Sequence, residues 1–417
     1  MSKIAALFYH LAIGMYVFLV KLAGLFSEKA RQRANAQKEI DATLALIKKE
    51  DPLIWIHSAS LGEFEQARPI VDRLRTSHPN HKILLTFFSP SGYLPRKHYA
   101  NADFVTYLPF DTQKKATDFV AKVNPQLVVW IKYDFWFNFL DEIGKRDIPF
   151  ILVAGRFRKE QLFFKNYGSF FAKKLNNFTH LFVQTQQSID LLNDIGIDHC
   201  SYAPDTRFDR VYTIYKEQKD LPKIAAFKND EALLVAGSTW QEGEKLLAQF
   251  YKEQQPNCKL LIVPHELGEA KLQRTLSLFG EQAKLFSQTD KEADLKEARI
   301  LILDTMGMLS SAYWYGDIGY IGGGFGKGIH NLLEAVVYRI PVMIGPKHKK
   351  FEEANDLVAQ QGVFVVNTVT EVAQVFAYLK DDKTLKRIKN IQEEYVASRL
   401  GGTDLVLDYI RLNLVDG

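Results

Sequence analysis

The stretch GGGFGKGIHN (residues 322–331), which continues as LLEAVVYRIPVMIGP to residue 346, decides how the rest of the chain is interpreted. The residues before it, GDIGYI (316–321), have the aromatic and β-branched content of a buried strand. After the glycines we expect a helical run that begins at Asn331 and ends before Pro341, and then a short strand over 342–344. The pattern therefore predicts strand, glycine loop, helix and strand.

A glycine loop that leads into a helix commonly binds phosphate, because the free N–H groups at the helix start point at the ligand. Two known phosphate motifs do not fit. A Walker A loop requires Gly at position 321, which is Ile, and Ser or Thr at position 328, which is Gly. No choice of these glycines supplies G-x-G-x-x-G. An ordinary strand-to-helix turn rich in glycine remains the alternative.

Composition excludes several classes of protein. A chain of 417 residues with 24% charged residues is long enough for two globular domains. The formal charge of +4 is small and not concentrated in blocks, so we expect no nucleic-acid partner. The only cysteines, Cys200 and Cys258, lie outside any C-x-x-C and no H-E-x-x-H occurs, so we predict neither a disulfide framework nor a metal site.

Residues 4–26 form an apolar run that only His10 and Lys21 interrupt, long enough for a helix to cross a bilayer. No small-residue cleavage site follows, so we favour a retained anchor over a signal peptide. Basic residues after the run (Lys29, Arg31, Arg33, Lys38) outnumber those before it, so we expect the bulk of the chain to face the cytoplasm, with this end at a membrane. A buried or interfacial amphipathic helix is the alternative.

From residue 51 onward, short apolar runs alternate with amphipathic ones, as in α/β folds with parallel sheets. We expect strands near 53–57, 83–87, 127–131, 150–154 and 180–184 in the first half, and near 232–236, 260–263, 300–303, 316–321 and 342–344 in the second. The predicted division is a membrane anchor helix (1–27), a first Rossmann-like domain (28–214), a linker (215–230), a second Rossmann-like domain (231–382) and a C-terminal helix that packs back across the junction (383–417).

Two carboxylates follow predicted strands of the first half. Glu63 lies in a Ser-Ala-Ser-Leu-Gly-Glu stretch at a helix start, where we expect it to stay ionised at neutral pH and to serve as a general base. Ser60 and Glu63 also match a capping box, which is the structural alternative. Asp134 follows the strand over 127–131, within an aromatic cluster.

Four loops of the second half each follow a predicted strand: Gly237–Thr239, Pro264–Glu266, Asp304–Leu309 and the glycine block. Loops after parallel strands meet at one edge of a sheet. Their convergence predicts a cleft of nucleotide size.

These residues resemble the Kdo transferases, membrane-associated enzymes that transfer 3-deoxy-D-manno-octulosonic acid (Kdo) from CMP-Kdo to the lipid A precursor of Gram-negative bacteria. Ala59–Glu63 is similar to the S-V-G-E stretch of that family, and Gly322–Pro346 to its G-G-H-N-x-L-E…P-V-x-x-G-P stretch. The resemblance implies the GT-B architecture, in which the first domain binds mainly the acceptor and the second the donor nucleotide. It also implies an inverting, metal-independent transfer with no cofactor, as a step of lipopolysaccharide core biosynthesis on lipid IVA.

The resemblance assigns roles by matching position. Glu63 would be the general base, and Asp134 matches the second Glu of the E-T-E-L-W-P-N motif. The donor-binding positions would be Gly237, Ser238, Thr239, His265, Thr305, Gly307, Met308, Gly324, Gly326, Lys327, Asn331 and Glu334. Because Arg forms bidentate bonds with carboxylates, Arg207 is the candidate for the sugar carboxylate, and Lys327 for the phosphate.

The chain departs from the family pattern at several positions. Met308 stands where many members have Glu, Glu266 replaces the Pro after His265, and Asp134 is one methylene shorter than Glu. Two other functions stay open. One is another GT-B enzyme, a transferase or an epimerase, that uses a UDP-sugar. The other is a membrane-tethered protein that binds a sugar nucleotide without turnover.

Overall fold

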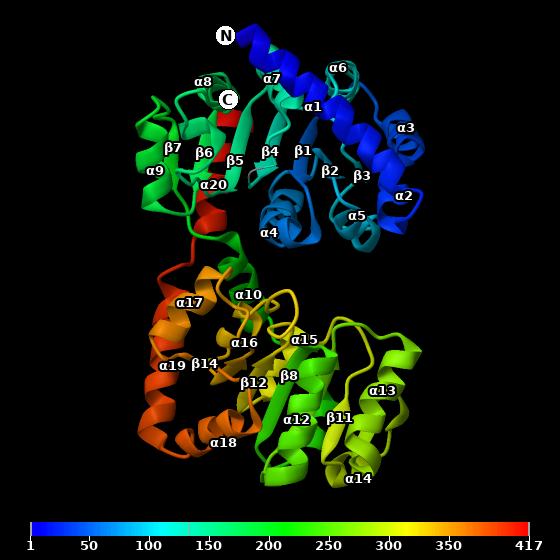
Figure 1. The fold of residues 1–417 in the computed structure, drawn as a ribbon, viewed down its shortest axis with the longest axis vertical. Coiled ribbons are helices and arrows are strands. Elements are labelled where there is room, and N and C mark those ends of the chain that lie inside the picture. The colour runs from blue at the N-terminus through cyan, green and yellow to red at the C-terminus, as the bar shows by residue number, and fades with distance from the viewer. Residues whose placement is uncertain (1, 133, 416–417) are drawn as a thin grey trace. The chain divides into compact units, whose positions relative to one another are not determined.

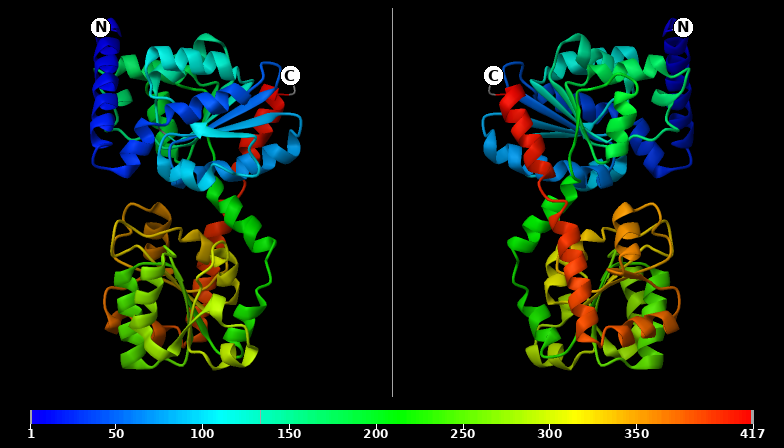
Figure 2. Two further views of the ribbon diagram at one scale, coloured as in Figure 1. Left: turned by 90° about the vertical axis from the view of Figure 1, so that its right-hand side faces the viewer. Right: turned by 90° about the vertical axis from the view of Figure 1, so that its left-hand side faces the viewer.

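The computed structural model describes residues 2–132 and 134–415 and shows two compact units (Figures 1 and 2). Unit 1 comprises Met1–Asp209 and Leu400–Gly417, and unit 2 comprises Arg210–Arg399. Each unit contains one parallel sheet of seven strands with helices around it. The predicted fold class, two Rossmann-like parallel sheets preceded by an apolar N-terminal helix, is confirmed.

The sheet of unit 1 has the strand order β3-β2-β1-β4-β5-β6-β7. Its strands are β1 (Leu53–Ser58), β2 (Lys82–Phe87), β3 (Phe104–Tyr107), β4 (Leu127–Ile131), β5 (Phe150–Gly155), β6 (His180–Val183) and β7 (Cys200–Tyr202). Its helices are α1 (Ser2–Ala23), α2 (Glu28–Ala34), α3 (Gln37–Leu46), α4 (Leu61–Ser77), α5 (Pro90–Arg96), α6 (Gln113–Val123), α7 (Phe137–Lys145), α8 (Ser169–Ala172), α9 (Gln186–Asn193) and α20 (Gly402–Ile410). The helix α10 (Thr206–Lys216) continues into unit 2.

The sheet of unit 2 has the order β10-β11-β9-β8-β12-β13-β14. Its strands are β8 (Leu233–Thr239), β9 (Lys259–Pro264), β10 (Ala283–Leu285), β11 (Ile300–Ile302), β12 (Ile318–Ile321), β13 (Val342–Ile344) and β14 (Val363–Val365). Its helices are α11 (Pro222–Lys228), α12 (Gln241–Gln254), α13 (Glu269–Phe279), α14 (Glu292–Glu297), α15 (Leu309–Ala312), α16 (Leu333–Val336), α17 (Glu352–Ala359), α18 (Val369–Tyr378) and α19 (Asp382–Ala397).

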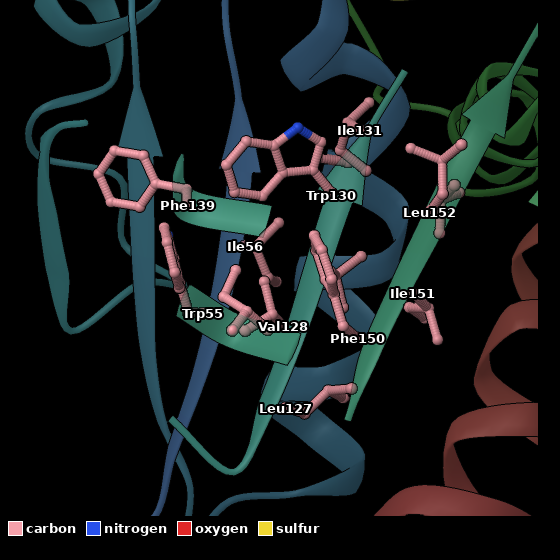
Figure 3. Packing of buried hydrophobic residues seen from close by; sticks show 14 of the residues in the cluster. Trp55, Ile56, Leu127, Val128, Trp130, Ile131, Phe139, Phe150, Ile151 and Leu152 are labelled. Atoms are coloured by element: carbon pink, nitrogen blue, oxygen red, sulfur yellow. The ribbon is translucent and has the colours of Figure 1, made fainter. Parts of the chain in front are cut away.

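Central strands are buried along their whole length because helices cover both faces of the sheet. Every residue of β1, β4 and β5 is buried. Figure 3 shows the packing on one side, where the rings of Trp55 and Trp130 lie 5.7 Å apart and Trp130 contacts Phe150 at 5.7 Å. This packing orients the ends of β1 and β4, from which Glu63 and Asp134 follow.

The helix α1 has two unlike faces. Tyr9 donates to the carboxylate of Asp111, accepts the N–H of Phe137 (3.1 Å), and packs on the ring of Phe137. Tyr16 stacks on Phe88. The opposite face exposes large apolar side chains: Leu7, Phe8, Leu11, Met15, Phe18, Leu19 and Leu22. The residues that α1 contacts follow β2, β3 and β4. The helix α1 therefore crosses the edge at which the strands of the unit 1 sheet (sheet 1) have their carboxyl ends (Figure 1).

Arg33, one of the basic residues counted after the apolar run, is buried in unit 1. Only 4% of it is exposed; its guanidinium lies 4.2 Å from the ring centre of Phe88 and 3.9 Å from that of Phe110. It donates to the carbonyl of Leu108 (2.8 Å). Burial lowers the pKa of Arg33 to about 10. Arg33 therefore holds α2 against the rest of unit 1.

The predicted domain boundaries stay a prediction. Residues 215–230, expected as a linker, include α11, whose Ile224 and Phe227 are buried. The C-terminal segment is shared, since α19 belongs to unit 2 and α20 to unit 1. Asp209 attaches α20 within unit 1 by accepting the N–H groups of Gly401 (2.7 Å) and Thr403 (2.6 Å), where a carboxylate favours a helix start.

Candidate functional site

Glu63 lies in the first turn of α4, directly after the buried strand β1. Its Oε2 accepts the N–H of Ala59 (2.7 Å). Ser60 is the N-cap residue, but its side chain makes no capping hydrogen bond. Only the glutamate half of the predicted capping box is therefore present, and the carboxylate is not fully explained by helix capping.

The electrostatics of Glu63 differ from the sequence expectation. Burial, and next the negative charge of Asp134, raise its pKa to about 7, whereas Lys132 and the N–H groups of Ala59 and Ser60 act in the opposite direction. The group is therefore not fully ionised at neutral pH, whereas the sequence had suggested that it would be. A pKa near the working pH suits a group that accepts and releases a proton.

Asp134 follows β4 and lies near Glu63, with its side chain 29% exposed. Its Oδ2 accepts the indole N–H of Trp136 (2.8 Å) and lies 3.8 Å from Nε2 of His57. Between the strand and Asp134, Lys132 adopts φ +63°, a left-handed conformation that is strained for a residue with a side chain. The structure therefore brings Glu63, Lys132 and Asp134 together at one edge of sheet 1.

His57 was missed as a site residue, although it lies in the HSASLGE stretch. It is fully buried in β1, its Nδ1 is 2.9 Å from Oγ1 of Thr86, and Nε2 has no hydrogen-bond partner. Trp55 donates to the same Thr86 oxygen (2.8 Å). Burial lowers the pKa of His57, so the ring is neutral and faces Asp134 without an added charge. A histidine inside an otherwise apolar strand was the available sequence signal.

The glycine block of unit 2 is divided by function. A Cβ on Gly322 would overlap the carbonyl of Ser238, and one on Gly324 would lie 2.6 Å from Cα of Gly345. These glycines allow backbones to pack closely. Gly326 and Lys327 are exposed, and nothing in the fold requires a glycine at 326, since a Cβ there meets only Gly323 O at 3.6 Å. The exposed part of the loop is therefore 326–327, and Phe325 packs partly against the core.

The helix after this block is shorter than predicted. It begins at Leu333 instead of Asn331 and has four residues, so its dipole is too small for the anion site that the sequence suggested. The loop itself offers donors instead. The carbonyl of Gly323 accepts the N–H of Gly326 (2.9 Å) and Gly328 (3.3 Å). Within residues 2–132 and 134–415, no group accepts from the N–H of Phe325 or Lys327.

Glu334 is positioned by two hydrogen bonds at the start of α16. Asn331 Nδ2 donates to Oε1 (2.9 Å) and Ser310 Oγ to Oε2 (2.9 Å). Oδ1 of Asn331 and Oγ1 of Thr305 are buried without a hydrogen-bond partner. Buried polar atoms normally have partners, so these two are available to a polar ligand.

The end of β8 places Gly237, Ser238 and Thr239 at the same sheet edge, so these residues, expected in a loop, belong to the strand. Gly237 packs against the hydroxyl of Tyr313, where a Cβ would overlap it, and its carbonyl accepts the N–H of Gly322 (2.9 Å). Ser238 has φ +50°, a second strained residue at a strand end. Gly307 (φ +84°) and Met308 precede α15, and Met308 is its N-cap residue.

Three aromatic residues meet beside this loop, and two of them were not predicted. His265 follows β9, Trp240 precedes α12, and His330 ends the glycine block. Trp240 Nε1 donates to His330 Nε2 (2.7 Å), and His265 stacks on His330 with ring centres 4.1 Å apart. Trp240 could have been found from its place directly after Gly-Ser-Thr.

Arg207, the candidate for a sugar carboxylate, is paired within unit 1. Its Nε and one Nη lie 2.9 and 2.8 Å from Oδ2 of Asp205, which also accepts from Gln66 (2.9 Å). Its role as a ligand for the sugar stays a prediction. In the described residues, no three His, Cys, Asp or Glu side chains form a group that could hold a metal ion.

We expect Gly324→Ala to lower the free energy of unfolding by about 1–3 kcal/mol, because the added methyl group meets a backbone atom that cannot move aside. Gly326→Ala is the matched control and should change it by less than about 0.5 kcal/mol. Urea denaturation followed by circular dichroism measures both. Equal losses in the two variants would show that the close packing of Gly324 is not what requires glycine.

We expect Glu63→Gln to be more stable than the wild type above pH 7. At pH values between the ordinary pKa of 4.5 and the folded-state pKa of about 7, Glu63 keeps its proton in the folded protein but has released it in the unfolded chain. Stability from this group is therefore present at low pH and is lost as the pH rises through 7. Urea denaturation at pH 5 and pH 8 should show the advantage of Glu63→Gln at pH 8 and its decrease at pH 5.

The control is Glu65→Gln on the same helix, where the carboxylate lies 3.2 Å from Arg96. Removing this paired group should not stabilise the protein at pH 8. If Glu63→Gln and the wild type had the same pH dependence of stability, the burial argument for Glu63 would be wrong.

Comparisons with known proteins agree with this geometry. Residues 28–210 match the model of a family described as 3-deoxy-D-manno-octulosonic-acid transferase (kdotransferase). The 3-deoxy-D-manno-octulosonic acid transferase of Haemophilus influenzae is 25% identical over 371 residues (86% of each chain). That of Aquifex aeolicus is 26% identical over 358 residues (82% of this chain and 91% of the relative).

The solved structure of UDP-GlcNAc 2-epimerase from Neisseria meningitidis bound to UDP-GlcNAc shares the fold, with a TM-score of 0.58, 14% identity, and 87% of this chain and 100% of that chain covered. Two parallel sheets of Rossmann type and this likeness correspond to the GT-B architecture. Over most of its length the chain is similar to Kdo transferases, and residues 28–210 match the model of that family.

Proposed function

We propose that the protein transfers Kdo from CMP-Kdo to a lipid A precursor, with inversion at the anomeric carbon and without a metal ion. The observation that carries the proposal is Glu63, a half-buried carboxylate with a pKa of about 7 at the carboxyl edge of sheet 1. The names of the curated relatives supply the sugar that is transferred.

In this reaction Glu63 accepts the proton of an acceptor hydroxyl, while the oxygen of that hydroxyl forms a bond to the anomeric carbon of Kdo. The bond from that carbon to the phosphate oxygen breaks, and CMP leaves with the electron pair. Inversion follows from this single displacement. Burial, and next the negative charge of Asp134, raise the pKa of Glu63, and Lys132 counteracts them, so together they set the pH range in which the base works.

For the donor, the N–H groups of Phe325 and Lys327 and the Lys327 ammonium are candidates for stabilising the phosphate that leaves. Fixed donors of this kind offset the charge that a metal ion offsets in other transferases. Glu334, which Asn331 and Ser310 orient, is the candidate for the ribose hydroxyls. Thr305 and Asn331 each offer an unpartnered oxygen for polar groups of the nucleotide.

We further propose that α1 lies along the cytoplasmic surface of the inner membrane. Its apolar composition and length would allow it to span a bilayer. However, Tyr9 and Tyr16 in the middle of the helix contact loops that include the carboxylate of Asp111. A spanning helix would carry these polar groups into hydrocarbon or lose the contacts. At 100° per residue, Phe8 and Phe18 point away from Tyr9, and the exposed His10 and Lys21 lie at the border between the faces.

The test is incubation of the purified protein with CMP-Kdo and a tetraacylated disaccharide acceptor, with the lipid product measured by mass spectrometry. We expect transfer by the wild type, a loss of at least about 100-fold in Glu63→Gln, and a rate that rises as the pH increases through 7 because the base must be deprotonated. Transfer should persist when a chelator is added.

Undiminished transfer by Glu63→Gln would remove Glu63 as the base, and loss of activity with chelator would remove only the metal-free part. A ligand-induced stability increase with UDP but not CMP would favour an enzyme that uses a UDP-sugar. Binding of CMP-Kdo without turnover on any acceptor would favour a binding protein.

For the membrane helix, we expect the double variant Phe8→Asp and Phe18→Asp to lose binding to vesicles of anionic phospholipid, because both side chains are about two-thirds exposed on the apolar face (66% and 64%). The control is Leu405→Asp on α20 of the same unit, an exposed apolar residue (49%) outside α1. Cosedimentation with vesicles measures binding. The double variant would contradict the proposal if it sedimented as fully as the wild type.

A further inference from the structure

The segment 134–137, which contains Asp134 and leads into α7, is contacted by α1 at two places (Figure 1). Within this segment the indole N–H of Trp136 donates to Oδ2 of Asp134 (2.8 Å). The indole N–H of Trp130 donates to the main-chain carbonyl of Asp134 (2.9 Å). The position of the Asp134 carboxylate therefore depends on where Trp136 lies.

The first contact is between Tyr16 of α1 and Trp136. Their ring centres lie 6.3 Å apart, and both rings stack on Phe88, at 6.2 and 4.5 Å. The guanidinium of Arg33 lies 4.2 Å from the ring centre of Phe88. These distances are typical of favourable aromatic and cation–π pairs. Tyr16 thus belongs to the cluster that fixes Trp136.

The second contact is made by Tyr9 of α1. Its hydroxyl oxygen accepts the N–H of Phe137 (3.1 Å), and its ring packs on that of Phe137 with centres 5.1 Å apart. The same hydroxyl donates to Asp111. Asp111 in turn accepts the N–H groups of Asn138 and Phe139 (both 3.1 Å). One hydroxyl group therefore attaches α1 to the start of α7.

Tyr9 and Tyr16 are seven residues apart in α1, about two helical turns, and so lie on one face. We propose that both are positioning residues of the site in unit 1, and that by holding the segment 134–137 they keep the carboxylate of Asp134 beside Glu63. The helix that binds the membrane surface in the proposed function is then also a part of the acceptor site. The inference rests on the proposed function only in this last respect.

The charge of Asp134 links the segment to Glu63. Burial, and next Asp134, raise the pKa of Glu63 to about 7, while Lys132 and the N–H groups of Ala59 and Ser60 lower it. The energy between two charges decreases with distance. If the segment moved away from Glu63, the pKa of Glu63 would therefore fall.

Two variants of the full chain test this without changing a charge. Tyr9→Phe removes the hydroxyl that binds Phe137 and Asp111 but keeps the ring, and Tyr16→Ala removes the ring that packs on Trp136. A change in the titration of Glu63 would then come from a movement of charges that are still present. The side chains that face Asp134 are those of His57, Arg33, Tyr9, Tyr16 and Trp136.

The measurement is the titration of Glu63 by NMR in the absence of substrate, in protein labelled with ¹³C at the glutamate carboxyl groups. The signal is assigned from its loss in Glu63→Gln. We expect a midpoint near pH 7 in the wild type. In Tyr9→Phe and in Tyr16→Ala it should be lower by at least about 0.5 on the pH scale, because Asp134 acts from a greater distance. Asp134→Asn keeps an oxygen for the N–H of Trp136 and should lower the midpoint further.

The matched control is Tyr99→Phe, which removes a hydroxyl that donates to Asp72 on α4 of the same unit. It should leave the midpoint of Glu63 unchanged. The double variant Tyr9→Phe and Asp134→Asn should titrate like Asp134→Asn alone, since residues that act through one partner are not additive. Circular dichroism checks that each variant folds.

An unchanged midpoint in either tyrosine variant would remove that residue from the proposal. An equal fall in Tyr99→Phe would show that lost stability is the cause, and a further fall in the double variant would show that the effect does not act through Asp134. Either result would overturn the proposal. If the titrations were as expected but no Kdo were transferred, the proposed reaction would fail while the role of α1 stood.

Where Kdo is transferred, the activity gives a second measurement. The pH at which the rate rises should decrease in Tyr9→Phe by the same amount as the midpoint of Glu63, while the KM for CMP-Kdo stays the same. A purely structural role of Tyr9 would lower the amount of active enzyme without moving the pH profile. An unmoved profile would therefore contradict the positioning role.

Discussion

The burial of two parallel sheets on both faces is the constraint on which the rest of the structure depends. Strands such as β1, β4 and β8 are enclosed by helices, so their side chains can only pack. Parallel strands all end at the same edge, and only the residues just beyond that edge are free to bind or react. Glu63 and Asp134 occupy such positions in unit 1, and His265 and the glycine block occupy them in unit 2.

Several residues at the same edge have strained backbones, unpartnered polar atoms or a shifted pKa, features that cost free energy and that functional sites tolerate. Lys132 and Ser238 adopt left-handed backbone conformations directly at strand ends, and Asn331 and Thr305 have buried oxygens without partners. Burial raises the pKa of Glu63 to about 7. None of these features stabilises the fold, and they lie among the residues that we assign to acceptor and donor. Stable sheets beneath the loops allow the strain to persist.

The central strands were predictable because their hydrophobic patterns are strong. The strands at the sheet edges have weak patterns and were missed. The strands β3, β7, β10 and β14 were not predicted, because most of their residues are partly exposed, whereas the equally short β11 and β13 are fully buried and were predicted. The helix at Asn331 was predicted too long, since four residues suffice where Leu333 and Val336 are buried by tertiary contacts. The sequence did not indicate that Arg33 is buried between two aromatic rings.

The sequence alone determined the fold class, the order of the loops and the residue types at their tips, because periodic hydrophobicity and glycine placement are local properties of the chain. Only the tertiary structure decided which glycines are needed for packing and which part of the loop is open. It also decided that Asp134 approaches Glu63, and that Trp240 and His330 share a hydrogen bond across ninety residues. These features depend on distances between strands far apart in the sequence, and on burial, which no local pattern specifies.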